Sequence, residues 1–214
     1  MPRVRKIKKT LPNKQKNYYV VDASFLVRNY VPIEIFTSEK EKKRIEDCQE
    51  WWKEINKQLK RGRARIYVPS ACIAESFKLL AQWAFHPSHK CFKSTQQYNY
   101  YRSKLSKHLT FPPSKMRSFS RKVTYHDVPM DRDIIISVDR FYELFAKYKK
   151  SVGIIDLSVA ATAKYLMDYY DIPKDNLHIV TLDTALREGI QKSQDLPNAY
   201  DPTLVSHHVD RIFE

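Results

Sequence analysis

Four carboxylates stand where apolar segments of the chain end or where a helix begins. Asp22 closes the apolar run YYVVD, and Asp183 closes LHIVTLD. Glu75 lies early in the segment SACIAESFKLL, and Asp156 lies at the head of GIIDLSVAATA. Residues that directly follow parallel strands meet in one crevice at the carboxyl edge of the sheet. We therefore expect the four side chains to share one small volume.

Carboxylates that are packed together raise one another's pKa values unless a positive charge neutralises them. A divalent cation is the usual solution, and oxygen ligands without His or Cys suit the hard ions Mg²⁺ or Mn²⁺. Such ions bridge carboxylates to phosphates, so a nucleic-acid backbone is the expected substrate. The predicted catalytic residues and metal ligands are Asp22, Glu75, Asp156 and Asp183.

Each acid also has a purely structural interpretation. Asp156 and Asp183 could be helix N-caps, for which Asp is a favoured residue. Asp22 could begin a turn through an Asx-type bond. Glu75 is harder to explain in this way, because its helical neighbours are apolar and no capping box would place a Glu there. The four together are more simply explained by a common site.

The elements that must position these acids alternate between strand and helix patterns. Apolar, β-rich runs predict strands at 18–22, 65–69 and 177–183. Helices are predicted at 38–59, at 70–85 with Ser70 as the N-cap, within 127–151 after a short edge strand or loop, at 153–170 and at 184–192. This alternation predicts an α/β fold, a parallel sheet flanked by helices.

Helical spacing also predicts which side chains pack inward. The helix at 38–59 is expected to pack through Ile45, Cys48, Trp52, Ile55 and Leu59. The helix within 127–151 is expected to pack through Ile135, Val138, Phe141, Tyr142 and Phe145.

The chain is strongly basic. Its 214 residues suffice for one domain with an insertion, and its net charge of +14 with a pI near 9.6 indicates polyanionic partners. Residues 1–17 are predicted to form a flexible basic arm, followed by a single domain over 18–214. The arm contains no acid, and its cations are Arg3, Arg5, Lys6, Lys8, Lys9, Lys14 and Lys16.

A basic and aromatic insertion is predicted at about 86–125, after the second strand–helix unit. No carboxylate occurs from Ser76 to His126. Cations interleaved with aromatic rings can hold phosphates and stack bases, so we expect single-stranded or structured RNA to bind here. The alternative is a solvated loop whose rings pack on the domain. The predicted RNA-binding residues are Lys90, Lys93, Tyr100, Tyr101, Arg102, Arg117, Arg121 and Lys122.

The cysteines do not suggest a disulfide framework. Cys48, Cys72 and Cys91 are odd in number and far apart, which indicates a reducing, cytoplasmic setting. No apolar run approaches the length of a membrane span or signal peptide. The motif HPSHKC, with His86 and His89, lacks the second ligand pair of a zinc finger, so zinc is not favoured there.

The order of YYVVDASFLV, VPSACIAESFKLL, GIIDLSVAATAKYL and LHIVTLDTAL resembles the PIN-domain nucleases, closest in style to the VapC-type toxin ribonucleases. The resemblance spans Tyr18 to about Ile190. DLSVAATA followed by TLD looks like the third and fourth acidic motifs of the family. The long basic insertion and the helix that carries Trp51 and Trp52 depart from compact members.

The resemblance implies a role for each acid. Asp22, Glu75 and Asp156 would be the core metal ligands, and Asp183 a more variable fourth acid. Ser24 would lie beside the site and is included among the nucleic-acid-binding residues, with Thr181 and Thr184 nearby. A metal-bound water would attack phosphorus in line, without a covalent enzyme intermediate.

Several functions remain open on the sequence. The main hypothesis is an Mg²⁺- or Mn²⁺-dependent endoribonuclease, either a toxin restrained by an antitoxin or a stand-alone RNA-processing enzyme. The alternatives are a structure-specific DNA nuclease and a catalytically silent RNA-binding PIN module; a homodimer is also open. A receiver or phosphatase would need adjacent acids or Asp-x-Asp, and Asp22-Ala23-Ser24 supplies neither.

Overall fold

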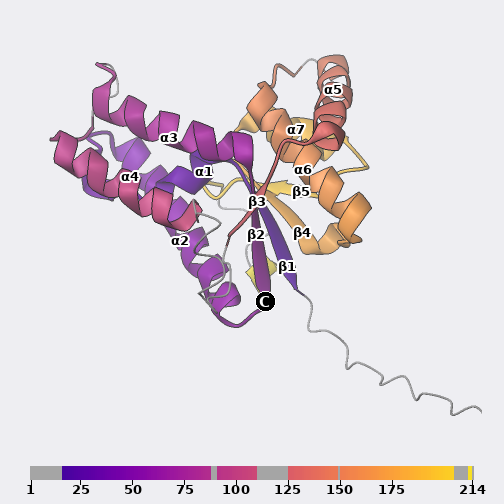
Figure 1. The fold of residues 1–214 in the computed structure, drawn as a ribbon, viewed down its shortest axis with the longest axis horizontal. Helices are drawn as coiled ribbons and strands as arrows, with labels where there is room; N and C mark the ends of the chain where they lie inside the picture. The colour runs from indigo at the N-terminus through magenta and orange to yellow at the C-terminus, as the bar shows by residue number, and fades with distance from the viewer. Residues whose placement is uncertain (1–15, 88–90, 110–124, 149, 205–211, 214) are drawn as a thin grey trace, which may run out of the picture.

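A five-stranded, all-parallel sheet forms the centre of the molecule (Figure 1). The computed structural model describes residues 16–87, 91–109, 125–148, 150–204 and 212–213. The strands lie in the order β3-β2-β1-β4-β5. They are β1 (Asn17–Val21), β2 (Ala64–Pro69), β3 (Tyr125–Val128), β4 (Leu177–Val180) and β5 (Asn198–Tyr200). The predicted fold class is confirmed, and its arrangement is consistent with a PIN-like fold.

Helices flank the sheet. They are α1 (Ala23–Arg28), α2 (Glu39–Lys60), α3 (Ser70–Phe85), α4 (Thr95–Leu109), α5 (Arg132–Lys147), α6 (Ile154–Tyr170) and α7 (Thr184–Lys192). Two short 3-10 turns cover Ile33–Ile35 and Lys174–Asn176. In Figure 1, α1 to α4 gather on one side of the strands and α5 to α7 on the other. Helix α6 packs across β1, β2 and β4.

The central strand explains the near-continuous apolar runs. Tyr19, Val20 and Val21 of β1 are fully buried, as expected of a parallel strand covered on both faces. The chain moves outward from β1 to β2 and β3 on one side, and from β4 to β5 on the other. The direction of strand order therefore reverses between β1 and β4, and ligands of open α/β sheets bind at the carboxyl edge of such a reversal.

Helix α2 packs as its spacing predicts. The Trp52 ring stacks on Phe25 with centroids 4.6 Å apart, and its indole N–H donates to the Phe25 carbonyl at 3.1 Å. Trp51, which the predicted stripe omitted, is also buried and contacts the rings of Tyr200 and Phe213. The two tryptophans fix α2 against both the start and the end of the chain.

A buried glutamine joins the first strand to the last residues. The Gln58 side chain accepts from the Tyr19 hydroxyl at 2.8 Å and donates to the Ile212 carbonyl at 2.9 Å. The Asn17 amide donates to the same carbonyl at 2.7 Å. Asn17 belongs to β1, so this strand begins one residue before the predicted strand. Residues 1–15 of the predicted arm lie outside the described residues.

Two details of the helices differ from the predictions. Helix α5 buries Ile134, Val138, Phe141 and Phe145, whereas Ile135 is 55% exposed and Tyr142 63% exposed. The Asp131 carboxylate caps the helix by accepting from the Ile134 N–H at 3.0 Å, so the inward stripe starts at position 134. Helix α3 begins at Ser70 itself, with Pro69 at the N-cap, so Ser70 is not the cap.

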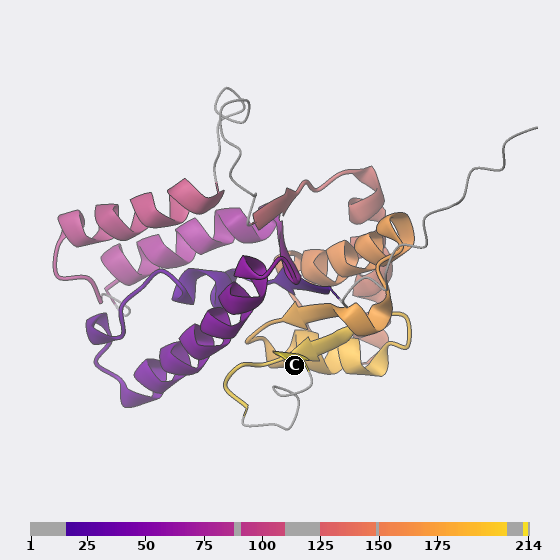
Figure 2. The same cartoon turned by 90° about the horizontal axis from the view of Figure 1, so that it is seen from below.

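The predicted insertion contains a further helix that the sequence analysis did not anticipate. Helix α4 lies against α3, as both views show (Figure 2). Its inner face carries Tyr98, Tyr101 and the fully buried Leu105. After the insertion, β3 joins the sheet beside β2.

In the part of the chain that is described, no helix is both long and apolar enough to cross a membrane.

Candidate active site

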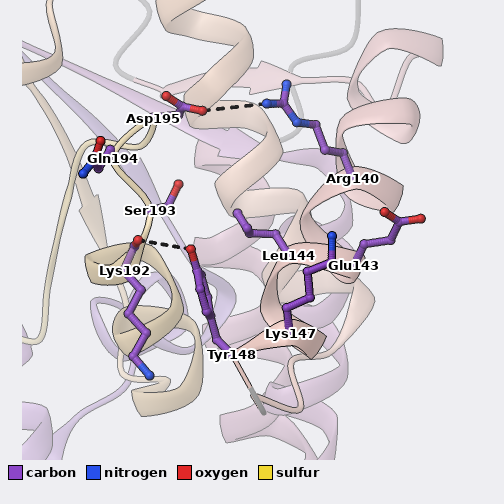
Figure 3. Close-up of a pocket in the computed structure, with 9 residues that line it drawn as sticks. All are labelled: Arg140, Glu143, Leu144, Lys147, Tyr148, Lys192, Ser193, Gln194 and Asp195. Carbon is purple, nitrogen blue, oxygen red and sulfur yellow. Dashed lines mark hydrogen bonds and ion pairs between the residues drawn. The ribbon is translucent and has the colours of Figure 1, made fainter.

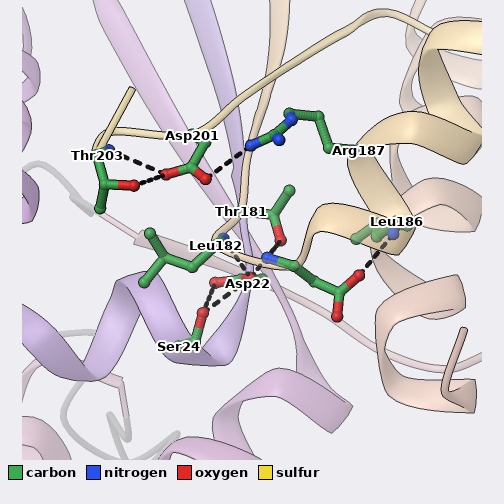
Figure 4. A network of polar contacts seen from close by, with 9 residues as sticks. Asp22, Ser24, Thr181, Leu182, Leu186, Arg187, Asp201 and Thr203 are labelled. Atoms are coloured by element: carbon green, nitrogen blue, oxygen red, sulfur yellow. Dashed lines mark hydrogen bonds and ion pairs between the residues drawn. The ribbon is translucent and has the colours of Figure 1, made fainter. Parts of the chain in front are cut away.

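Asp22 is the most tightly held acid at the carboxyl edge (Figure 4). It follows β1 directly, caps α1 and is only 3% exposed. Its carboxylate accepts the Phe25 N–H at 2.7 Å, the Thr181 hydroxyl at 2.5 Å and the Leu182 N–H at 3.3 Å. The Ser24 hydroxyl lies 3.0 Å from both carboxylate oxygens. Thr181 and Leu182 follow β4, so their bonds to Asp22 fix the end of β1 against the end of β4.

Asp183 is joined to the same network through Thr181. The Thr181 hydroxyl donates to Asp22 and accepts the backbone N–H of Asp183 at 2.9 Å. Asp183 caps α7, and its Oδ1 accepts the Leu186 N–H at 2.5 Å. The capping interpretation is therefore correct for Asp183, and Asp22 caps α1. Capping does not compete with a shared site, because the caps bring both acids to the same edge.

Asp156 is not the N-cap of its helix. Gly153 occupies that position, and Asp156 is the third residue of α6, where its carboxylate accepts the Gly153 backbone N–H. A Cβ at position 153 would lie 3.1 Å from the Asp156 Oδ2. Glycine therefore leaves room for the carboxylate to fold back over the start of the helix.

Glu75 is brought to the site by the contact of α3 with α1. The next residue, Ser76, is fully buried; its hydroxyl donates to the Cys72 carbonyl at 2.7 Å and lies 3.4 Å from the Ala23 carbonyl. Ala23 follows Asp22 directly, so this contact sets Glu75 beside it. The buried Cys72 thiol also lies here: burial raises its pKa, and the charges of Asp22, Glu75 and Asp156 raise it further. The sequence analysis assigned Cys72 no place near the acids.

The charges show that the four acids share one neighbourhood. Burial raises the pKa of Asp156 to about 7, and the negative charges of Asp183, Asp22 and Glu75 contribute, in that order. Burial also raises the pKa of Asp22, although its hydrogen bonds from Thr181, Phe25, Ser24 and Leu182 oppose the rise. The pKa of Glu75 is raised by burial and by Asp22, against the opposing charge of Lys78.

These acids have the chemistry of a hard-cation site. Within the described residues, none of the four forms an ion pair with Lys, Arg or His. Within those same residues, no three His, Cys, Asp or Glu side chains are close enough together to form a ready metal cage. Oxygen donors that raise one another's pKa fit Mg²⁺ or Mn²⁺ by their chemistry. The site is an acidic neighbourhood, and not a preformed ligand cage.

A fifth acid at this edge was missed by the sequence analysis. Asp201 follows β5 and forms a largely buried ion pair with Arg187 of α7, at 2.6 Å. Its other oxygen accepts the N–H of Thr203 at 2.9 Å and the Thr203 hydroxyl at 2.7 Å (Figure 4). The three-residue strand before it gave no apolar signal. Because Arg187 neutralises Asp201, this acid has a different role from the other four.

None of the four acids lines the pocket drawn in Figure 3. This pocket lies between α5 and the end of α7 and is lined by side chains of both charges. Tyr148 donates from its hydroxyl to the Lys192 carbonyl at 3.3 Å, and Arg140 pairs with Asp195 at 3.7 Å. The candidate site is therefore defined by charge at the sheet edge and not by this hollow.

The predicted nucleic-acid-binding residues fall into three groups. Ser24 contacts Asp22 directly, as described above. Lys93, Tyr100 and Arg102 are exposed, whereas Tyr101 is half-buried. The remaining ones, Lys90, Arg117, Arg121 and Lys122, lie outside the described residues, as does His89 of the HPSHKC motif.

Comparison with known proteins gives structural likeness only. No family model matches the chain, and no curated protein matches it in sequence. The fold is similar to VapBC2 from Rickettsia felis bound to a DNA fragment from their promoter, with a TM-score of 0.50 and 11% identity over 86% of this chain and 98% of that chain. It is also similar to FitAB bound to an IR36 DNA fragment, with a TM-score of 0.51 and 14% identity over 89% and 99%.

The chain therefore has an α/β fold with a parallel sheet that is similar to chains of VapBC2 and FitAB. At such identity these likenesses show the fold alone, so activity has to be argued from the residues.

Proposed function

We propose that this chain is a metal-dependent endoribonuclease of the PIN-domain family. In this proposal Asp22, Glu75, Asp156 and Asp183 hold Mg²⁺ or Mn²⁺ at the carboxyl edge of the sheet. The observation that carries the proposal is the pKa of Asp156, raised to about 7 by burial and by the three other acids, with no ion pair to any of the four in the described chain. Holding several acids close together without a neutralising cation costs folding free energy, and such an arrangement is typical of a functional site.

Two further observations support the family and substrate. The order of the acidic motifs resembles PIN-domain nucleases, and the fold is similar to VapBC2 and FitAB. The net charge of +14 favours a polyanionic substrate. A phosphodiester backbone suits both the acidic edge, through a bridging cation, and the net positive charge of the chain.

The residues divide the chemistry between them. A bound Mg²⁺ or Mn²⁺ supplies a water of lowered pKa and neutralises charge that develops on phosphate. Asp22 is held in one orientation by four donor groups, which favour its charged form and make it the fixed ligand. Asp156 and Glu75 are less constrained and provide the remaining negative charge. Thr181 sets the distance between Asp22 and Asp183.

The likeness to VapBC2 and FitAB extends the proposal to a protein partner. Because the sequence resembles VapC-type toxins, an antitoxin that covers the acidic edge is the kind of partner we propose. A stand-alone RNA-processing enzyme is the second form of the same activity.

The test is cleavage of end-labelled RNA by the purified chain with EDTA, Mg²⁺ or Mn²⁺. We expect cleavage with either ion, none with EDTA, and loss of cleavage in Glu75→Gln. Asp139→Asn is the matched control, since it removes one charge from an exposed position on α5. Cleavage of DNA but not RNA would favour the structure-specific DNA nuclease, binding without cleavage would favour the silent module, and rescue by zinc alone would contradict an all-oxygen site.

A further inference from the structure

One exposed surface, on α4 where this helix lies against α3, has cations without neutralising acids. We define the α3–α4 face by Lys93, Tyr100, Lys104 and Lys107. No Asp or Glu occurs in the sequence between Glu75 and Asp127. Among the described residues, none of the face's cations forms an ion pair. Their charge is therefore available to an anion from outside the chain.

Helix α2 shows that this is not a general property of the chain's lysines. Lys42, Lys43 and Lys57 of α2 each pair with an acid three or four residues away. Such pairs are a normal way to balance an exposed helix. Helix α4 has the same opportunity by geometry but contains no acid.

One aromatic ring on the face is open for stacking. Tyr100 is 55% exposed, and the Lys104 ammonium lies 4.7 Å from its ring centroid. Tyr101 instead packs inward against Phe92, with centroids 5.8 Å apart. Tyr100 is therefore the more exposed of the two rings. A base can stack on the ring face that Lys104 does not cover, and Lys104 is close enough to contact the adjoining phosphate.

The platform is held rigidly on the body. The Tyr98 ring meets Phe85 edge-on with centroids 4.9 Å apart, and Leu105, four residues after Tyr101, is fully buried. A ring fixed by its helix loses little entropy when it binds a base. The face is therefore preorganised for binding.

The face also leads towards the acids. The Arg102 guanidinium lies 5.9 Å from the centroid of the Phe77 ring, which joins α4 to α3. Lys78 of α3 is close enough to lower the pKa of Glu75 against its rise by burial. Helix α4 lies against α3, the helix that carries Glu75, so RNA bound to α4 lies beside a helix that reaches the acids.

We propose that the α3–α4 face binds a single-stranded segment of RNA a few nucleotides from the bond that is cut. Phosphates contact Lys104 and Lys107, and one base stacks on Tyr100. The proposal rests on the proposed ribonuclease function for the position of the cut. A duplex is excluded, because its bases are stacked on one another and cannot lie on Tyr100.

The binding test uses the full chain in EDTA and a fluorescent oligouridine of about twelve nucleotides, within the usual range for single-strand sites. The double variant Lys104→Gln/Lys107→Gln should bind about 10-fold more weakly near 0.1 M salt, and its log–log salt slope should fall by about 1.4. Lys43→Gln/Lys57→Gln on α2 removes the same charge and should leave the slope within about 0.3 of the parent. Equal slopes for the two double variants would overturn the phosphate contacts.

The stacking platform has its own variants. Tyr100→Ala should weaken binding about 10-fold or more without a change in slope, whereas Tyr100→Phe should bind like the parent. Equal binding by Tyr100→Ala, or equal affinity for duplex RNA, would overturn the single-strand assignment. If Lys104→Gln/Lys107→Gln instead loses a polyglutamate peptide and keeps oligouridine, the face binds an acidic protein.

Cleavage separates this proposal from the function on which it rests. With an RNA that is cut, Lys104→Gln/Lys107→Gln should raise KM about 10-fold and leave kcat unchanged, since it is remote from the acids. A fall in kcat alone would overturn the proposed role. If neither the parent nor any variant cleaves RNA while the oligouridine slopes still change as expected, the ribonuclease proposal fails and the binding face stands.

Discussion

The carboxyl edge and the α3–α4 face each carry charge of one sign without a partner, but in opposite surroundings. At the edge, Asp22 is almost fully buried and Asp156 has a pKa raised to about 7. On the face, Lys104 and its neighbours are exposed, so water and salt screen them. Leaving a charge without a partner therefore costs little folding free energy on the exposed face and much at the buried edge. The difference indicates that the edge is adapted to bind a compact counterion tightly, and the face to hold a polymer weakly.

The largest effect is expected on the rate of RNA cleavage when an acid at the carboxyl edge is replaced. Asp156→Asn should slow RNA cleavage about 100-fold or more, because it removes a ligand charge while keeping the shape of the side chain. Oligouridine binding in EDTA should be unchanged or tighter, since one negative charge is lost. The measurements are single-turnover cleavage and a binding titration on the same preparation. Cleavage at the parental rate, with Asp139→Asn as control, would show that the site is elsewhere.

The next largest effect is a fall in the free energy of unfolding as the pH rises. The folded pKa of Asp156, about 7, lies above its ordinary value of 3.8, so between these pH values the folded state binds more protons than the unfolded state. Its contribution to stability is therefore present at low pH and is lost as pH rises from about 4 to about 7. Solvent screening at this half-buried group reduces the loss to about 1–2 kcal/mol.

Urea unfolding at about pH 5 and about pH 8 measures this loss. In EDTA the parent should lose more stability over that interval than Asp156→Asn, and Mg²⁺ or Mn²⁺ should restore the parent at the higher pH. Identical pH dependence of parent and variant would contradict the assigned charge repulsion.

Two substitutions of Asp183 distinguish the role of its charge from the role of its capping hydrogen bond. Asp183→Ala should lower the free energy of unfolding by about 1 kcal/mol, because the Leu186 N–H loses its acceptor. Asp183→Asn keeps an acceptor and should cost less. If Asp183 supports the metal, both variants should slow cleavage to a similar extent. A slow Ala variant beside a fully active Asn variant would assign Asp183 to structure alone.

The smallest effect is expected on the free energy of unfolding when lysines of the α3–α4 face are replaced. Lys104→Gln/Lys107→Gln should change the free energy of unfolding by less than about 0.5 kcal/mol, since these cations have no acid to lose. Thermal and urea unfolding of this variant and of Lys43→Gln/Lys57→Gln provide the check. A larger loss in the α4 variant would mean that its lysines help to hold the fold.

Much of this fold could be predicted from the sequence because its signals were long. The apolar runs before Asp22 and Asp183 are buried strands, and the residues from Leu157 to Ala163 of α6 are buried as expected. Short or polar elements could not be found in this way. Strand β5 has three residues, α1 has six, and α4 is mostly polar. Each is specified by its tertiary contacts and not by its own periodicity.

The sequence predicts which acids form the candidate site, but not the contacts that bring them together. Strand ends placed Asp22 and Asp183 at one edge, but the hydroxyl of Thr181 that joins them could be read only from the structure. Helix α5 buries Ile134 and leaves Ile135 and Tyr142 exposed, because its packing against the rest of the fold and not its apolar pattern decides which side faces inward. Tyr100 and Tyr101 could not be separated by sequence, since consecutive aromatic residues give no sign of which one faces inward.

The hydrogen bond from Thr181 to Asp22 can form only late during translation, because the two residues are far apart in the sequence. The two residues are separated by 159 positions, and the bond from Asn17 to Ile212 spans 195. Contacts between such distant segments form late, because loop closure must precede them. A growing chain can assemble β1, β2 and the α3–α4 hairpin while the place of β4 beside β1 is still vacant. A nascent chain would then be able to hold RNA before it can cut it, and the proposed cutting activity arises only once β4 has been synthesised and has joined β1.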